Sequence, residues 1–138
     1  MTKTEILEFI NANPTCYLAT SENNKPHVRG MRLYRADGKG IIFQTSNVKD
    51  LFKQLKENPH VELCFFSNEK NIQIRISGKA TFLNDLDLKK EIVEKRPFLK
   101  SWVEKKGFDM IIVLRIVDCI AHQWTMETNF LPKEYINL

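Results

Sequence analysis

The segment Phe43–Leu63 carries residue types that bind an anion. Lys49, Lys53 and Lys56 recur at intervals of four and three residues, which gathers them on one face of a helix. Polar residues 45–47 come directly before that helix, where side-chain oxygens cap some free N–H groups and leave others for a phosphate. This pattern predicts either an anion site at the turn or a capped surface helix with solvated lysines.

The same segment predicts the helix that presents these groups. Its apolar side chains fall at helical spacing on the face opposite the lysines, at Val48, Leu51, Phe52 and Leu55. We expect the helix to run from about Asn47 and to end at Asn58-Pro59, because proline disfavours a helical residue before it.

A second group of candidate residues lies on the predicted strand His27–Tyr34. Alternation places Arg29 with His27, Met31 and Leu33 on one face, and Arg32 with Val28, Gly30 and Tyr34 on the other. A buried arginine needs an anion, an acidic partner or solvent near its guanidinium. For the arginine on each face we therefore expect a ligand contact, an internal ion pair or a side chain that snorkels to solvent. Gly30 allows a flat ligand to approach the strand closely, or else marks a bulge.

The remaining reactive side chains indicate no other chemistry. The three histidines, including His27 and His122, show no metal-ligand spacing, and we predict no metal site. The three widely spaced cysteines indicate buried thiols rather than a disulfide framework. No nucleophile motif, P-loop or dinucleotide fingerprint is present. Trp124 either forms the wall of a planar ligand site or packs in a core or dimer contact.

The elements that position these residues predict one mainly β domain over residues 1–138. A length of 138 residues and 43% hydrophobic composition are sufficient for one packed core. We predict peripheral helices and six strands, which in so small a domain protect their edges best by closing into an antiparallel barrel. The predicted strands are 16–20, 27–34, 41–45, 61–66, 72–83 and 110–123.

Three further predicted helices accompany this sheet, in addition to the one that begins near Asn47. Thr2-Lys3-Thr4-Glu5 has the form of a capping box that opens the first helix. Residues 86–95 form the second, and Pro97 opens a short third helix that Gly107 ends. The charged N-terminus and the lack of a long apolar run predict a cytoplasmic protein without membrane contact. A net charge of +4 permits anionic ligands, but we expect no nucleic-acid partner.

Four stretches of the chain follow one another in a characteristic order and spacing: CYLAT, KPHVRGMRLY, GIIFQTSNVKDLFKQLKENPHVEL and IQIRISGKATFL. Together they resemble the pyridoxamine 5′-phosphate oxidase-like family of FMN-binding split-barrel proteins. The resemblance covers nearly the whole chain and implies a six-stranded antiparallel split β-barrel. It also implies a homodimer with two FMN molecules in grooves at the subunit interface.

The resemblance implies a set of FMN-binding residues. The strand along the flavin would supply a cation and backbone groups, the next strand would meet the ribityl and phosphate end, and Lys49 would be the basic phosphate ligand. A glutamine and a late aromatic residue would complete the flavin contacts. In chain order the set is Arg29, Gly30, Met31, Arg32, Leu33, Gln44, Thr45, Ser46, Lys49, Gln73 and Trp124.

One departure bears on the substrate. True pyridoxamine phosphate oxidases carry a late arginine motif for their substrate, whereas this sequence has no arginine after Arg115. The sequence therefore predicts an FMN-dependent oxidoreductase that acts on another small molecule, with NAD(P)H as a possible electron donor. The alternatives are a non-catalytic flavin-binding or sensing protein and a haem-binding or haem-degrading split-barrel protein, the latter through His27 or His122.

Overall fold

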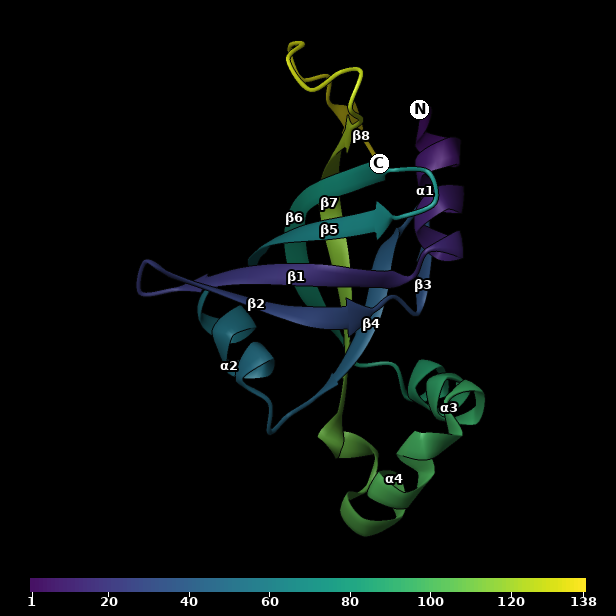
Figure 1. Ribbon diagram of the computed structural model, residues 1–138. Coiled ribbons are helices and arrows are strands. Elements are labelled where there is room, and N and C mark those ends of the chain that lie inside the picture. The colour runs from purple at the N-terminus through teal and green to yellow at the C-terminus, as the bar shows by residue number, and fades with distance from the viewer.

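The computed structural model describes residues 1–138 as one curved antiparallel sheet with helices around it (Figure 1). The strands are β1 (Thr15–Glu22), β2 (Lys25–Arg32), β3 (Arg35–Asp37), β4 (Gly40–Ser46), β5 (His60–Ser67), β6 (Ile72–Leu83), β7 (Ile111–Trp124) and β8 (Ile136–Asn137). The helices are α1 (Lys3–Ala12), α2 (Asp50–Glu57), α3 (Leu86–Lys95) and α4 (Lys100–Lys106), with 3-10 turns η1 (Pro97–Leu99) and η2 (Phe108–Met110).

The strand order explains why the barrel is split. Neighbouring strands follow the path β2-β1-β5-β6-β7-β4-β3, with β8 paired to β7. The two ends of this path, β2 and β3, are joined by only residues 33 and 34, so the sheet must curl to bring its ends together. β2 and β4 nevertheless do not pair, and an opening remains between them.

All six expected strands are present, and the expected count is wrong by two short strands. The predicted strand 27–34 ends at Arg32, because Tyr34 already donates its N–H to the Ile42 carbonyl at 2.9 Å and so belongs to the crossing to β3. β8 forms where the chain returns to β7, with Ile136 opposite Ala121. Neither short strand has an alternating run long enough to predict it.

Two hydrophobic cores hold the sheet and its helices. The larger core has 21 buried residues and fills the barrel interior against α1 and α2. The smaller core has 7 and packs α3 and η1 onto the outer side of β4 and β7, through residues such as Ile42 and Val113. The start of β7 is therefore covered on both faces, as its continuous apolar sequence predicts. α3 and α4 form the lobe at the lower end of Figure 1.

The termini of the helices confirm one local prediction and correct another. The capping box is present, since Glu5 N–H donates to Thr2 Oγ1 at 3.2 Å and Thr2 N–H donates to Glu5 Oε2 at 2.6 Å. The expected start of α2 is wrong: the helix begins at Asp50, and Lys49 is its N-cap. Residues 46–49 form a turn instead, in which Lys49 N–H donates to the Ser46 carbonyl at 3.1 Å.

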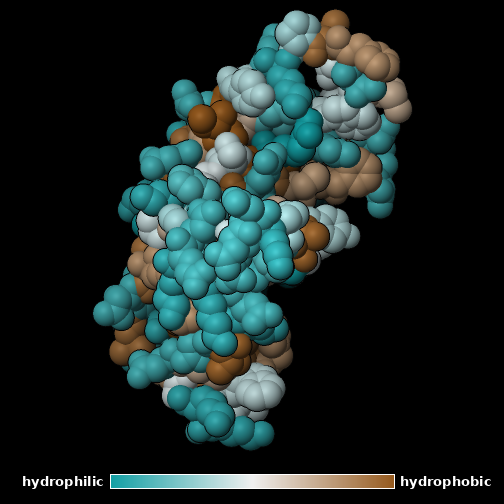
Figure 2. Space-filling view, turned by 90° about the vertical axis from the view of Figure 1, so that its left-hand side faces the viewer, coloured by the Kyte–Doolittle hydropathy of each residue, from teal (hydrophilic) through white to brown (hydrophobic).

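The outer surface varies along the molecule. The face that carries α2 and the β1–β2 hairpin is mostly hydrophilic, and apolar side chains gather on the C-terminal loop above it (Figure 2). In that loop Phe130 is 96% exposed and Leu131 is 61% exposed. None of the helices is long and apolar enough to span a bilayer.

Candidate functional site

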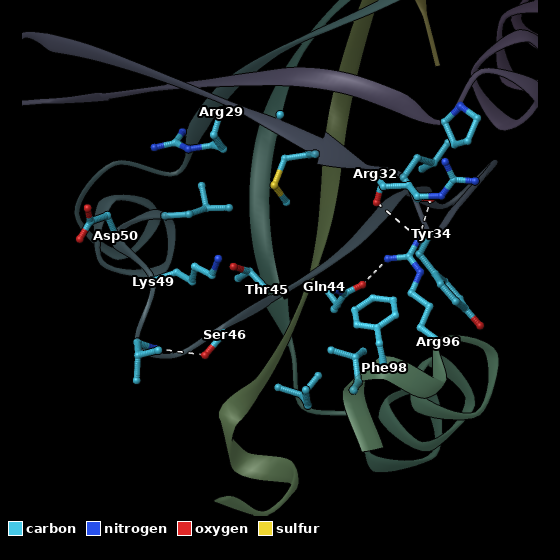
Figure 3. Close-up of a pocket in the computed structure, with 18 of the residues that line it drawn as sticks. Arg29, Arg32, Tyr34, Gln44, Thr45, Ser46, Lys49, Asp50, Arg96 and Phe98 are labelled. Atoms are coloured by element: carbon cyan, nitrogen blue, oxygen red, sulfur yellow. Dashed lines mark hydrogen bonds between the residues drawn. The ribbon is translucent and has the colours of Figure 1, made fainter. Parts of the chain in front are cut away.

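A cavity of about 1460 Å³ lies along the opening between β2 and β4. α2 borders it at one end, and the α3–α4 lobe borders it at the other (Figure 3). Nine of the eleven residues predicted to bind FMN line this cavity: Arg29, Gly30, Met31, Arg32, Leu33, Gln44, Thr45, Ser46 and Lys49. Residues distant in sequence thus meet at one concave site, as expected for a ligand pocket.

The charge of the cavity is strongly positive. One acidic residue, Asp50, lines it, against five basic residues: Arg29, Arg32, Lys49, Lys95 and Arg96. None of these five forms an ion pair, since the three ion pairs of the chain join His27 to Glu22 and Arg35 to Asp37 and Glu91. A cavity with unpaired cations attracts an anionic ligand.

At the α2 end, hydrogen-bond donors remain free. No side chain caps α2: in its first turn Phe52 N–H donates to the Lys49 carbonyl at 3.2 Å, and the N–H groups of Asp50 and Leu51 have no capping side chain. The Ser46 hydroxyl oxygen accepts from Val48 N–H at 3.4 Å, which leaves its proton for another acceptor. Figure 3 shows the Lys49 side chain extending beside Thr45 on the same side of the cavity. Ammonium, hydroxyl and helix N–H groups together suit a phosphate.

Arg29 forms a polar cluster beneath α2. Its Nη1 donates to Thr20 Oγ1 at 2.9 Å, and its Nη2 donates to Gln54 Oε1. Thr20 also donates to Gln54 Oε1 at 2.7 Å, and both partners are at least 95% buried. Burial lowers the pKa of Arg29, and the nearby Asp50 charge opposes that shift. Neutral oxygens receive the guanidinium, so the internal ion pair, one of the alternatives for Arg29, is not formed.

β2 forms the edge of the sheet along the cavity. Its alternation agrees with the prediction: His27, Arg29 and Met31 are half-buried, whereas Val28 and Gly30 are exposed. Because β2 pairs only with β1, its other edge has backbone groups without a ladder partner. A Cβ built at Gly30 meets no atom within 4 Å, so the packing of the chain does not require glycine there.

At the lobe end, Arg96 organises a second set of contacts. Its guanidinium donates to Gln44 Oε1, and Nη2 donates to the Leu33 carbonyl at 3.0 Å (Figure 3). The guanidinium carbon lies 5.3 Å from the centroid of the Tyr34 ring. Burial lowers the pKa of Arg96, and the Arg32 charge lowers it further. This side chain therefore joins α3 to β2 and β4 across the cavity.

The sequence did not identify Arg96 or Tyr34 as site residues. Arg96 meets Gln44 across 52 positions of sequence, and no local spacing indicates such a contact. The Tyr34 hydroxyl donates to Glu91 Oε2 at 2.6 Å, and burial together with this acceptor raises the pKa of Tyr34 to about 12. For Arg96, the one local signal in the sequence is its place directly before Pro97, at the end of a predicted helix.

Gln73 and Trp124 lie outside the cavity. They face each other across the β6–β7 ladder, and Gln73 also pairs with Phe66 of β5. Trp124 Nε1 donates to Asn129 Oδ1 at 2.8 Å. Within one chain these two residues do not join the other nine, and their contact with a flavin stays a prediction.

The histidines and cysteines form no further site. His27 lines the cavity, while His122 Nδ1 lies 3.3 Å from the Glu134 carbonyl on the other side of the sheet. No group of three or more His, Cys, Asp or Glu side chains is placed to hold a metal ion. Cys16 and Cys119 are buried as predicted, and burial raises the pKa of Cys16 to about 12.

The sequence matches the model of one protein family. That family is described as pyridoxamine 5′-phosphate oxidase, and its model matches residues 2–115. A pyridoxine/pyridoxamine 5′-phosphate oxidase from Psychrobacter cryohalolentis is 36% identical over 86 residues, which are 60% of this chain and 39% of that protein. The chain spans less than half the length of the oxidase relatives that it matches.

Solved structures share the fold. A NimC/NimA family protein from Clostridium acetobutylicum superposes with a TM-score of 0.79 at 24% identity, over 98% of this chain and 92% of that one. A pyridoxamine 5′-phosphate oxidase-related, FMN-binding protein from Nostoc punctiforme gives a TM-score of 0.65 at 14% identity, over 96% and 88% of the two chains. These likenesses establish the split-barrel architecture.

Proposed function

The chain belongs to the pyridoxamine 5′-phosphate oxidase family, and from this premise we propose that it is an FMN-binding flavoprotein that acts as an oxidoreductase on a small molecule. The observation that carries the proposal is the cavity between β2 and β4, with five basic side chains free of ion pairs and an uncapped helix start. FMN combines a phosphate dianion with a flat ring system, and the α2 end of this cavity and its β2 edge suit those two parts.

The α2 end fits the phosphate. Lys49 supplies a charge that no carboxylate of the chain neutralises, and Thr45 and Ser46 supply hydroxyl groups beside it. Charge-assisted hydrogen bonds to phosphate are among the stronger ones in proteins. Arg29 adds a second positive charge behind this end, held in place by Thr20 and Gln54. In this arrangement Lys49 binds the phosphate, and the charge of Arg29 makes the electrostatic potential around it more positive.

The β2 edge fits the ring system. Backbone groups on the unpaired edge of β2 suit the donors and acceptors at the polar edge of an isoalloxazine, and the open space at Gly30 admits a flat ring. Met31 packs against the larger core and offers an apolar surface. The bound flavin supplies the electron-transfer chemistry, while the residues of this chain bind it, orient it and exclude water.

A homodimer would bring Gln73 and Trp124 to the flavin. Both lie on the outer face of the sheet, where Tyr17 is 60% exposed and Phe66 is 39% exposed. A surface with several exposed aromatic side chains suits an interface between protein chains. We propose that a second copy covers this face and contributes Gln73 and Trp124 to the cavity of the first.

Purified protein tests the proposal directly. We expect flavin absorbance in the visible region, bleaching on reduction, and a released chromophore with the mass of FMN. A colourless protein that takes up no added FMN would overturn the proposal. FMN uptake without turnover with any electron donor would instead identify the non-catalytic flavin-binding alternative. Uptake of haem in place of FMN, lost on substitution of His27 or His122, would identify the haem-binding alternative.

A further inference from the structure

The net charge of the chain resides in one segment, residues 95–106, which forms η1, α4 and the end of α3. The whole chain has 21 basic and 17 acidic residues. The segment holds one acidic residue, Glu104, and five basic ones: Lys95, Arg96, Lys100, Lys105 and Lys106. Without the segment, 16 basic and 16 acidic residues remain. The positive charge is thus local, and it borders the lobe end of the cavity.

The same segment exposes two aromatic side chains. Leu99 and Val103 pack in the smaller core, so the buried face of the segment is already occupied. Phe98 is nevertheless 65% exposed and Trp102 is 53% exposed, and both line the cavity. Figure 3 shows the Phe98 ring pointing from η1 toward Gln44. Lys105 Nζ lies 5.8 Å from the centroid of the Trp102 ring. Aromatic surface and positive charge therefore occur together.

The cavity has room for more than one ligand. Its volume of about 1460 Å³ exceeds the roughly 300–1,000 Å³ of pockets that hold a single small molecule. The proposed FMN phosphate occupies the α2 end, whereas Phe98 belongs to η1 and Trp102 to α4 at the lobe end. The lobe end thus offers a second subsite with aromatic walls and basic side chains.

We propose that this second subsite binds the adenosine-phosphate part of a nicotinamide dinucleotide. A purine ring stacks on aromatic side chains, and at this subsite Trp102 and Phe98 provide them. Its phosphates meet the guanidinium group of Arg96 and the ammonium group of Lys95, which both line the cavity. The inference rests on the proposed function, because an FMN-dependent oxidoreductase needs an electron donor. Binding of the dinucleotide itself requires no flavin.

Tryptophan fluorescence tests the inference, because the chain has two tryptophans and, within one chain, Trp102 is the one that lines the cavity. In the Trp124→Phe protein all tryptophan emission comes from Trp102, and we expect NADP⁺ or NAD⁺ to quench it saturably. Trp102→Ala should weaken binding at least about fivefold, the loss that corresponds to one stacked base. A Trp124→Phe protein without saturable quenching would overturn the inference, as would affinity unchanged by Trp102→Ala.

Charge variants and competitors sharpen the test. Lys95→Ala should weaken dinucleotide binding severalfold, and added salt should weaken it further. Lys53→Ala, an exposed lysine of α2 outside the cavity, is the matched control and should bind as the wild type does. Adenosine 5′-monophosphate should compete, whereas inorganic phosphate at the same concentration should not. Tighter binding of a single-stranded oligonucleotide than of either dinucleotide would overturn the inference in favour of a nucleic-acid surface.

The same preparation separates the two proposals. FMN uptake, read from visible absorbance, tests the flavin site. Dinucleotide binding, read from Trp102 with and without FMN, tests the lobe subsite. Protein that takes up FMN but binds no dinucleotide contradicts only the second proposal. Protein that binds dinucleotide at Trp102 but takes up no FMN contradicts only the first.

Discussion

Replacing Lys49 by alanine perturbs the proposed phosphate site with little effect on the fold. The Lys49 side chain is exposed, forms no ion pair and makes no side-chain hydrogen bond, and its N-cap position depends on the backbone. We expect the free energy of unfolding to change by no more than about 0.5 kcal/mol, as for surface substitutions.

The expected loss in FMN affinity follows from one interaction. A hydrogen bond to a charged group contributes about 1.5–3 kcal/mol, which corresponds to roughly a 10- to 150-fold increase in Kd. The assay is titration of flavin-free protein with FMN, followed by the fluorescence of the flavin. Lys53→Ala serves as the control, because Lys53 lies within α2, four residues after Lys49, and does not line the cavity. Equal Kd values for Lys49→Ala and the wild type would refute the placement of the phosphate, as would an equal loss in Lys53→Ala.

Three further predictions test other parts of the site. Gly30→Ala should change the free energy of unfolding by no more than about 1 kcal/mol and should weaken FMN binding in titration, while Gly38→Ala, which also has open space but lies outside the cavity, should not. Asp50→Asn should lower the Kd for FMN severalfold by removing the one carboxylate of the cavity, and an unchanged Kd would place the phosphate away from α2. The raised pKa of Tyr34, from 10.0 to about 12, means that the unfolded chain loses this proton first, so stability present below pH 10 should be lost as pH approaches 12. Tyr34→Phe should reduce that decline in urea unfolding, and an identical decline would contradict the assigned shift.

Local sequence patterns predicted most of the sheet. The alternation of β2 placed Arg29 and Gly30 on opposite faces, and the continuous apolar run of β7 indicated that both its faces are covered. Capping chemistry located the start of α1 at Thr2. These features depend on neighbours within a few residues, so one sequence is sufficient to identify them.

The predictions failed where the structure depends on more than the local sequence pattern. Val48 fits the apolar face of the predicted helix, yet it is 76% exposed, because the 46–49 turn delays the helix to Asp50. The Phe98 and Trp102 positions follow from the docking of the α3–α4 lobe on β4 and β7. Arg96 reaches Gln44 only in the folded chain. Tertiary packing, rather than local propensity, fixes the second half of the cavity.

The central claim is that this cavity holds FMN with its phosphate at the start of α2. A crystal structure of the protein with FMN tests it most directly. The account predicts phosphate oxygens within about 3 Å of Lys49 Nζ and of the N–H groups in the first turn of α2, with the flavin ring along β2. FMN bound elsewhere, or in the cavity with its phosphate away from α2, would contradict it.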